Sequence, residues 1–275
     1  MAAPHFDATR LGDAALLTGA SGGLGAALAA ALARPGMLLH LGGRDPARLA
    51  AVAQSCRARG ASVREQIIDV RDGPAMAAWI AGTDQLGLVI ANAGISAGLG
   101  GGTGEQRRQV EEIFAVNLLG VLNTVLPAIE RLAAAPAGAD GVRGRIGAVA
   151  SLAGFVALPG TPSYSASKAA VDTWMVASAP AAARRGVQLT SLCPGFIRTP
   201  MTAANPYRMP GLMAPESAAA RMLAALAAGR RRAAFPWWLY AEARLVDMLP
   251  PALAARLLGS AKPKPARAYE TAADG

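Results

Sequence analysis

The sequence predicts an α/β fold in which a doubly wound parallel sheet of about seven strands is flanked by helices on both faces. Two observations lead to this prediction. Short, continuously apolar runs alternate with longer alanine-rich segments of helical period, which is typical of parallel strands buried under helices. The chain has 275 residues, 53% hydrophobic and 16% charged, which excludes an intrinsically disordered protein and fits one large α/β domain.

The apolar runs and the helical segments follow one another in a regular order. Strands are predicted at residues 14–17, 37–41, 63–70, 86–91, 146–150 and 187–193, with a last strand near 233–236. Helices are predicted at residues 23–34, 45–58, 73–82, 105–134 and 163–185. Parallel strands joined by crossovers of one hand give a doubly wound sheet. We predict a single domain over residues 1–260, with a helical appendix at about 237–260 and a disordered tail at 261–275.

The net charge of +9 is unevenly distributed along the chain. Residues 221–275 hold nine basic and four acidic side chains, so the last fifth of the chain carries +5 of the excess. A basic excess gathered at one end argues against a nucleic-acid-binding face spread over the fold. Three arginines at 230–232 precede Trp237, Trp238 and Tyr240, a composition compatible with peripheral membrane contact. The favoured alternative is a segment packed on the body or on another subunit.

Composition also limits the cellular context and the kind of site. Cys56 and Cys193 form no CxxC pair, so we expect neither a disulfide framework nor a metal site, and a reducing cytoplasm is the predicted location. Three uncharged stretches, at 14–33, 85–104 and 146–167, reach the roughly 20 residues of a membrane helix. Each is interrupted by Gly, Ser, Thr, Asn or Pro, so no span is predicted, and the N-terminus does not match a signal peptide.

A glycine-rich turn follows the first predicted strand. The chain reads Thr18-Gly19-Ala20-Ser21-Gly22-Gly23-Leu24-Gly25 and continues into an alanine-rich helix. A strand, a glycine turn and a helix in this order bring backbone N–H groups and the positive helix end onto a pyrophosphate. The turn therefore predicts a dinucleotide site, with a purely structural turn as the alternative.

The end of the second predicted strand indicates which dinucleotide binds. The strand ends at Gly43, without the carboxylate that would hold a ribose 2′-OH, and Arg44 follows. The planar guanidinium of arginine pairs with phosphate oxygens and can stack on adenine, so NADP(H) is preferred, with NAD(H) still compatible. Asp45 is the competing residue: it either faces the ribose or, as we favour, caps the helix that begins at Pro46.

One lysine stands apart from the other cations. Before the tail, Lys168 is the single lysine of the chain, and Tyr164 precedes it by one helical turn. A neighbouring ammonium favours a phenolate by about 1–3 pKa units, which would let Tyr164 exchange a proton with an alcohol or carbonyl oxygen near neutral pH. Ser151 ends a predicted strand where open α/β sheets bind ligands. The alternatives are a nucleophilic serine, for which no histidine is suitably placed, and an exposed Tyr/Lys pair.

Taken together, these motifs resemble those of the short-chain dehydrogenase/reductases. The resemblance covers about residues 13–236 and includes Asn92-Ala93-Gly94, Asn117 and Pro194-Gly195-x-x-x-Thr199 in the family's order and spacing. It implies a Rossmann-like fold and an enzyme acting on CH–OH donors. By the same resemblance, Tyr164 is the general acid/base, Lys168 holds the nicotinamide ribose and lowers the tyrosine pKa, Ser151 orients the substrate oxygen, and Asn117 completes a proton relay.

The resemblance also assigns the cofactor-binding residues. Asp69, with Val70 after it, would receive the adenine amine; Asn92, Ala93 and Gly94 would line the adenosine side; Thr199 with the Ile197 backbone would hold the carboxamide. The other cofactor-binding residues would be Thr18, Gly19, Ser21, Gly22, Gly23, Leu24, Gly25, Arg44, Tyr164, Lys168, Pro194 and Gly195. Singly, each has a structural alternative, such as a helix cap at Asp69. Adjacent Gly22 and Gly23 also fit the extended branch of sugar-nucleotide epimerases, but the 76 residues after Thr199 favour the short branch.

The expected substrate is lipophilic. Methionines and prolines in residues 199–213 form an adaptable apolar lid, and Leu152, Phe155, Val156 and Leu158 follow Ser151, either as pocket lining or as core. We therefore expect a ketone or secondary alcohol of steroid-like, acyl or aromatic type, handled by a homodimer or homotetramer that binds no nucleic acid. The rival function is a non-catalytic NADP(H) sensor, against which the intact set Asn117, Ser151, Tyr164 and Lys168 argues.

Overall fold

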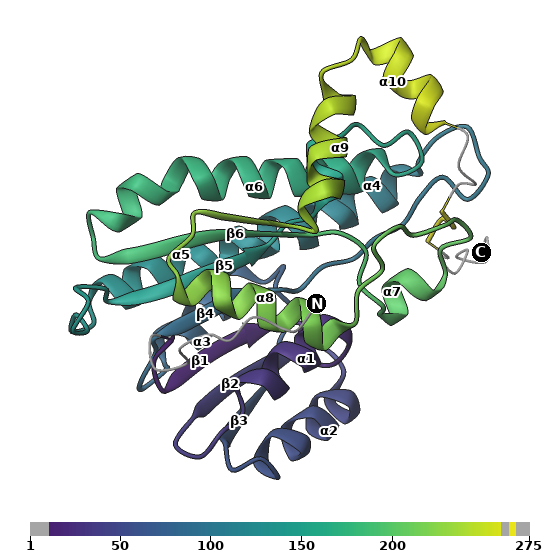
Figure 1. Cartoon of the computed structure of the whole chain (residues 1–275). Helices are drawn as coiled ribbons and strands as arrows, with labels where there is room; N and C mark the ends of the chain where they lie inside the picture. Colours follow the sequence, from purple (N-terminus) through teal and green to yellow (C-terminus); the bar gives the residue numbers. More distant parts are fainter. Residues whose placement is uncertain (1–10, 260–263, 268–275) are drawn as a thin grey trace.

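The computed structural model describes residues 11–259 and 264–267. Within them, seven strands form one sheet in the order β3-β2-β1-β4-β5-β6-β7, with every neighbouring pair parallel (Figure 1). The strands are β1 Ala14–Thr18, β2 Leu38–Gly43, β3 Ser62–Ile67, β4 Leu88–Ala91, β5 Gly144–Val149, β6 Val187–Pro194 and β7 Arg232–Phe235. The predicted doubly wound α/β fold is confirmed.

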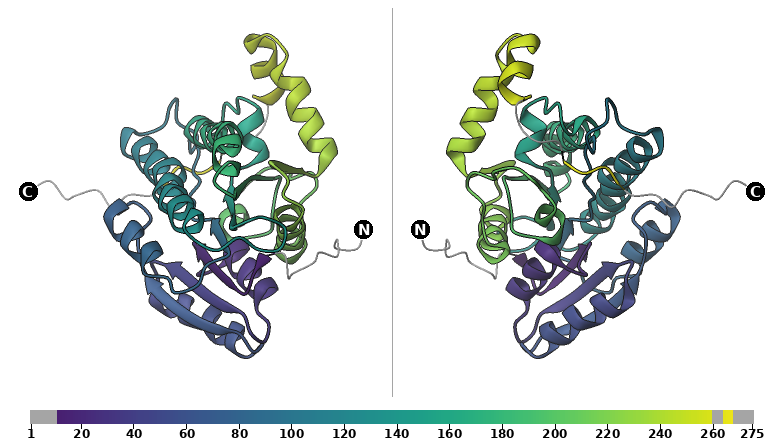
Figure 2. Two further views of the ribbon diagram at one scale, coloured as in Figure 1. Left: turned by 90° about the vertical axis from the view of Figure 1, so that its left-hand side faces the viewer. Right: turned by 90° about the vertical axis from the view of Figure 1, so that its right-hand side faces the viewer.

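Helices cover both faces of the sheet (Figure 2). One core packs the sheet against α1 Gly23–Leu32, α2 Pro46–Arg57 and α8 Pro215–Ala227. The other core packs the opposite face against α3 Gly73–Ala81, α5 Gly120–Ala133 and α6 Pro162–Ala183. Strands β1, β4, β5 and β6 are buried along almost their entire length, which explains why they appear in the sequence as continuous apolar runs.

Two predicted elements differ in detail from the structure. The segment predicted as one helix over 105–134 is α4 Arg107–Phe114, a π-helical turn Ala115–Leu119, and α5. The strand predicted at 63–70 is β3, which stops at Ile67 and has mostly exposed side chains because it lies at the edge of the sheet. Among the described residues, the continuous helical stretch Arg107–Ala133 alone is long and apolar enough to cross a membrane; here it packs on the sheet with Val121, Val125 and Leu132 buried.

The strand order indicates at which end of the sheet ligands bind. The direction in which successive strands are added reverses between β1 and β4: β2 and β3 extend the sheet on one side of β1, and β5, β6 and β7 extend it on the other side of β4. At such a point the connections leave the two strands toward opposite faces, so a crevice opens outside their carboxyl ends. Thr18 ends β1 and Ala91 ends β4, so ligand-binding residues are expected just after them.

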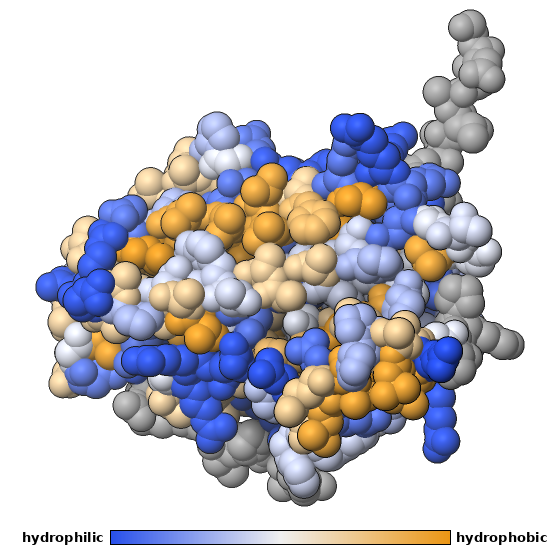
Figure 3. All heavy atoms as spheres, turned by 90° about the horizontal axis from the view of Figure 1, so that it is seen from above, coloured by the Kyte–Doolittle hydropathy of each residue, from blue (hydrophilic) through white to orange (hydrophobic). Residues whose placement is uncertain are grey.

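The last described residues form a helical hairpin and a short segment that lies on the body of the domain. After α7 Pro200–Ala203, α8 and β7, the hairpin consists of α9 Trp237–Asp247 and α10 Pro251–Leu258. It exposes large apolar side chains, with Trp237 76% and Met248 81% exposed. Figure 3 shows hydrophobic residues exposed on the face of the molecule seen from above. The predicted disordered tail is wrong for residues 264–267, which are hydrogen-bonded to the loop after β4. The rest of the tail, including Lys262, lies outside the described residues.

Candidate active site

A cleft of about 550 Å³ lies at the carboxyl ends of the strands. It brings together the glycine turn, the ends of β2, β4, β5 and β6, the start of α6 and the segment that begins α7. Of all the site residues predicted from the sequence, only Asn117 is not part of its lining. One continuous cleft therefore joins the predicted phosphate-binding residues to the predicted catalytic ones.

Three glycines of the turn are required by its geometry, and one is not. Gly19 and Gly23 have φ of +65° and +54°, values that side-chain-bearing residues rarely adopt. A Cβ on Gly25 would overlap the carbonyl oxygen of Gly19. Gly22 has extended backbone and open space where its Cβ would lie. The turn thus follows the spacing Gly19, Gly23, Gly25, which is that of the short branch.

Hydrogen bonds join the glycine turn to the end of β4. The side-chain nitrogen Nδ2 of Asn92 donates to the carbonyl oxygens of Thr18 and Gly19, both at 3.1 Å. In return, Thr18 Oγ1 accepts from the backbone N–H groups of Asn92 at 3.1 Å and Ala93 at 3.2 Å. Asn92 and Thr18 therefore fix the two strand ends at the point where the strand order reverses.

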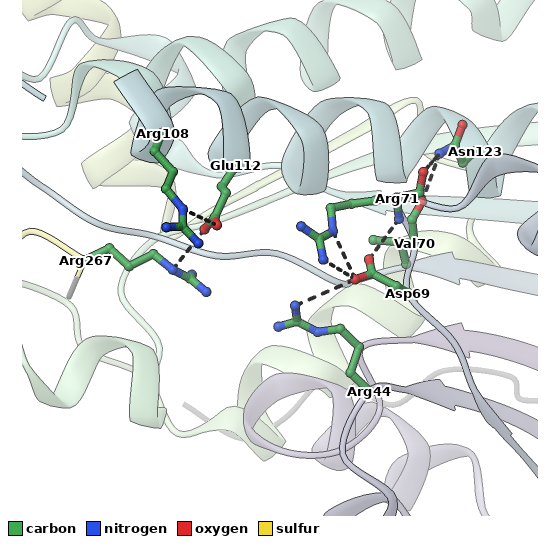
Figure 4. Close-up of polar contacts among 8 residues, drawn as sticks. All are labelled: Arg44, Asp69, Val70, Arg71, Arg108, Glu112, Asn123 and Arg267. Carbon is green, nitrogen blue, oxygen red and sulfur yellow. Dashed lines mark hydrogen bonds and ion pairs between the residues drawn. The ribbon is translucent and has the colours of Figure 1, made fainter. Parts of the chain in front are cut away.

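At the far end of the cleft, charged side chains surround the position predicted for the adenosine. Arg44 is about half exposed, and its Nη1 lies 3.9 Å from Asp69 Oδ2 (Figure 4). Asp45 caps α2, because its side chain accepts from the backbone N–H of Arg48 at 3.0 Å, and this hydrogen bond lowers the pKa of its carboxyl group. Asp45 is thus held at the helix start as favoured, which leaves Arg44 to extend over the cleft.

Arg71 is a residue of this end that sequence reasoning missed. Its Nη2 and Nε lie 2.6 and 3.0 Å from Asp69 Oδ2, and its backbone N–H donates to Asp69 Oδ1 at 3.0 Å. The side-chain hydrogen bonds from Arg71 are the main reason why the pKa of Asp69 is lowered. Asp69 is therefore a fixed carboxylate. The sequence contains one indication of this pair: Asp69 stands two residues before Arg71, and an aspartate at that spacing often closes a local turn by hydrogen bonds.

The residues predicted to be catalytic meet at the start of α6. Ser151 ends the run after β5, Tyr164 lies in the first turn of α6, and Lys168 one turn later donates from Nζ to the carbonyl oxygen of Val149 at 2.7 Å. Burial lowers the pKa of Lys168 to about 8. Burial also raises the pKa of Tyr164, against a smaller lowering by its hydrogen bond with Ser151.

The predicted lowering of the Tyr164 pKa by Lys168 does not appear in this structure, where burial sets the direction of the shift. Lys168 Nζ is 5.8 Å from the centre of the tyrosine ring and is directed at a backbone carbonyl. The phenol is protonated at neutral pH in this state. A protonated phenol beside a hydroxyl is suited to donate a proton to a carbonyl oxygen.

Asn117 lies behind the cleft wall, in the π-helical turn. Its side chain accepts from the backbone N–H of Ile95 at 2.8 Å and donates to the carbonyl of Ile95 at 2.9 Å. A Cβ on Gly94 would lie 3.3 Å from Asn117 Oδ1 and 3.5 Å from Lys168 Nζ, so only a glycine separates the two side chains. The π-helical turn, a feature frequent at functional sites, places Asn117 next to Lys168.

The segment after β6 closes over the glycine turn. Thr199 begins α7, and its side chain lies 3.3 Å from where a Cβ on Gly23 would be. Thr202, which the sequence reasoning did not single out, donates from Oγ1 to the carbonyl of Ile197 at 2.6 Å and also lines the cleft. The capping box of α7 thus holds this segment at the edge of the cleft, and the Thr-x-x-Thr spacing of Thr199 and Thr202 could have indicated it from the sequence.

The apolar side chains after Ser151 do not form the lining that was one of their two predicted roles. Leu152 and Phe155 are buried in the core, where the Phe155 ring packs edge-on against Tyr240 of α9 at 4.9 Å. Apolar lining at the catalytic end of the cleft comes from Ile95, Val116 and Met201. Glycine backbone, a half-exposed Arg44 and this apolar end together fit a dinucleotide with a small organic substrate beside it.

Comparison with known proteins identifies relatives of this chain. The model of the short chain dehydrogenase family matches residues 13–208. An uncharacterized oxidoreductase of Myxococcus xanthus is 36% identical over 244 residues, covering 86% of this chain and 92% of that protein. A proposed ketoacyl reductase of the monensin polyketide synthase of Streptomyces virginiae is 34% identical over 195 residues, covering 68% and 71%. A short-chain dehydrogenase of Sphingobium yanoikuyae in complex with NADPH has the same fold, with a TM-score of 0.74 at 23% identity and coverage of 94% and 98%.

Proposed function

The chain belongs to the short-chain dehydrogenase/reductase family, and from this premise we propose that it is an NADP(H)-dependent oxidoreductase acting on a lipophilic ketone or secondary alcohol. Membership makes it an NAD(P)-dependent dehydrogenase/reductase with a nicotinamide cofactor and a small-molecule substrate. The observation that supports the proposal most is the single cleft shared by the glycine turn, Ser151, Tyr164 and Lys168.

The proposed mechanism divides the work among the residues of the cleft. When bound, the nicotinamide supplies or accepts the hydride. Gly19, Gly23 and Gly25 let the backbone approach the pyrophosphate closely, and Lys168 Nζ would hold the nicotinamide ribose. Ser151 would orient the substrate oxygen by a hydrogen bond. Tyr164 would donate its proton to that oxygen during reduction of a ketone and would accept the hydroxyl proton during oxidation of an alcohol. Asn117, beside Lys168, would complete a proton relay from this site to water.

The proposed preference for NADP(H) rests on Arg44. Its guanidinium lies beyond Gly43 at the end of β2, half exposed and 3.9 Å from the nearest carboxylate oxygen of Asp69. In Arg44→Ala we expect NADPH affinity to fall by about tenfold, as for one lost charge-assisted contact, while NADH affinity stays within about twofold. Cofactor fluorescence measures both affinities. Arg64→Ala, which removes an arginine paired with Asp84 outside the cleft, is the matched control.

A panel of ketones with NADPH tests the proposed activity and substrate class. Turnover of steroid-like, acyl or aromatic ketones supports the proposal, and turnover restricted to small polar sugars contradicts the lipophilic substrate. Equal NADPH and NADH affinities, unchanged in Arg44→Ala, contradict the cofactor preference. NADPH binding with no turnover of any carbonyl compound would instead favour the rival function, a cofactor sensor that keeps the fold.

We further propose that the protein is a cytoplasmic homo-oligomer. The exposed apolar side chains of α9 and α10, including Trp237, Leu245 and Met248, support an interface with a second copy of the chain. Light scattering after gel filtration would give a dimer or tetramer, and Met248→Asp would shift the mass toward the monomer. Flotation of the protein with anionic liposomes at low salt, together with a monomeric mass, would favour peripheral membrane contact instead. The division into one domain over residues 1–260 stays a prediction.

A further inference from the structure

The C-terminal segment at residues 264–267 is attached to the loop that follows β4. The backbone N–H of Gly98 donates to the carbonyl of Pro265, and that of Gly100 to the carbonyl of Lys264, both at 2.9 Å. The loop is shaped for this contact, because a Cβ on Gly98 or Gly100 would lie only 2.6 to 2.7 Å from atoms of the segment. In Figure 1 the segment runs between this loop and α7.

The far end of the segment is held by α4. The buried side chain of Gln109 accepts from the backbone N–H of Arg267 at 2.9 Å and donates to the carbonyl of Gly98 at 3.1 Å. Arg267 Nε lies 3.1 Å from Glu112 Oε2 (Figure 4). Contacts at both ends therefore place the side chain of Lys264 at one defined position.

Lys264 lies directly behind the lining of the cleft, in contact with one lining residue and with the neighbour of another. It is 7% exposed, and its Nζ is 2.8 Å from Ser96 Oγ and 3.5 Å from the carbonyl oxygen of Met201. Met201 and Ile95, the neighbour of Ser96, both line the cleft. Ser96 is two residues from Gly94, whose Cα faces Lys168 Nζ.

The charge of Lys264 is not balanced by a carboxylate in the described part of the chain. Its hydrogen-bond partners are neutral oxygens, and burial lowers the pKa of its ammonium to about 8. By contrast, Arg145 is paired with Asp140 and Arg232 with Asp172. Lys168 is the other buried lysine with a neutral partner, and it faces the cleft. An unbalanced buried charge is costly, so an anion supplied from the cleft would be bound favourably.

We propose that Lys264 is a specificity-determining residue, whose ammonium binds a carboxylate carried by the substrate at a distance from the carbonyl group that reacts at Ser151 and Tyr164. The substrate is then an oxo acid or hydroxy acid with an apolar middle, which lies against Ile95 and Met201. This proposal rests on the proposed function and narrows its substrate class. An ammonium has three N–H groups, and Ser96 and Met201 accept two of them, which leaves one for the carboxylate.

A series of oxo acids, each compared with its own methyl ester, tests the proposal. The probes are 4-oxopentanoate, 6-oxoheptanoate, 8-oxononanoate and 4-acetylbenzoate, assayed with NADPH on the full-length protein. We expect kcat/KM for at least one acid to exceed that of its ester by about tenfold, and Lys264→Gln to abolish this ratio while leaving the ester within about twofold. Lys264→Arg should retain most of the ratio.

Arg267→Gln is the matched control, since it removes a cation of the same segment whose partner, Glu112, is outside the cleft lining. It should leave the ratio of acid to ester unchanged. Calorimetric binding of each acid to the NADP⁺-loaded protein gives a second readout, in which Lys264→Gln should weaken acid binding about tenfold. Thermal melting confirms that each variant is folded.

The outcomes separate this proposal from the proposed function. If esters are reduced as well as acids, or if Lys264→Gln lowers both equally, Lys264 only fastens the segment and the proposal fails while the oxidoreductase activity stands. If NADPH binds but no acid binds in a Lys264-dependent manner, the proposal fails in the same way. If NADPH does not bind at all, both fail together.

Discussion

The two ends of the cleft are built in different ways. The phosphate end depends on backbone: three glycines of one eight-residue turn, at positions set by a positive φ or a close contact. The catalytic end depends on side chains from separate parts of the chain, namely Ser151 after β5, Tyr164 and Lys168 on α6, and Lys264 from the C-terminal segment. The glycines of the phosphate end are close together in the sequence, whereas the side chains of the catalytic end come together only when the sheet has formed and the C-terminal segment has packed against it.

This difference affects how the two ends respond to substitution. A side chain added at the phosphate end meets backbone atoms that cannot move away, so it should change both stability and cofactor binding. A side chain changed at the catalytic end removes a proton donor or a charge without disturbing the backbone, so it should act mainly on turnover or substrate binding. Three predictions test this contrast, in order of decreasing effect.

The largest effect is expected for Tyr164→Phe. Without the phenol hydroxyl, no group beside Ser151 can exchange the proton, so kcat should fall about 10²- to 10⁴-fold. NADPH affinity, measured by cofactor fluorescence, should stay within about threefold because the ring remains in place. A comparable loss of NADPH affinity would mean that the two ends are not separable in this way.

A smaller effect is expected for Gly25→Ala at the phosphate end. The added Cβ would overlap the Gly19 carbonyl oxygen, which should destabilise the fold by about 1–3 kcal/mol and weaken NADPH binding. Gly22→Ala is the matched control, since open space surrounds that Cβ. Thermal and urea unfolding should show Gly22→Ala within about 0.5 kcal/mol of the wild type. Equal destabilisation by both substitutions would contradict the assigned turn geometry.

The smallest effect concerns the pH dependence of stability. Lys168 and Lys264 have pKa values of about 8 in the fold, against 10.5 for a free lysine side chain. Between these values the unfolded chain holds more protons than the folded one, so each lysine makes the free energy of unfolding rise as pH increases, by at most about 1.4 kcal/mol per pH unit. Lys168→Met and Lys264→Met should each remove part of this rise.

Urea unfolding at several pH values between about 8 and 10 measures this rise. The comparison of the two lysine variants shows whether the C-terminal segment stays in place in solution. If Lys264→Met leaves the pH dependence of the wild type unchanged while Lys168→Met reduces it, the segment spends much of its time detached, and only the α6 lysine is permanently buried.

Sequence reasoning succeeded where a local pattern has one physical cause. The buried parallel strands appear as apolar runs, Asp45 before Pro46 begins α2, and the glycine turn follows β1 directly. It was less successful for properties that depend on the surroundings of a side chain in the folded protein, such as its pKa or its burial. Nothing in the sequence indicated that burial would raise the pKa of Tyr164, and the sequence left open whether Leu152 and Phe155 line the pocket or pack in the core. It also assigned residues 264–267 to a disordered tail, because a lysine between two prolines has no local pattern of order.

The sequence by itself therefore determined the order of strands and helices, the phosphate-binding turn and the identity of the Ser151, Tyr164 and Lys168 set. The tertiary structure decided which glycines the turn needs, how Asp69 and Arg71 pair, that Asn117 lies behind Gly94, and that Lys264 lies beside the catalytic end. The physical reason is how far apart along the chain the interacting residues lie. Backbone conformation and helix capping depend on neighbours along the chain, whereas desolvation and the pairing of charges depend on residues up to 168 positions apart, which only the folded chain brings together.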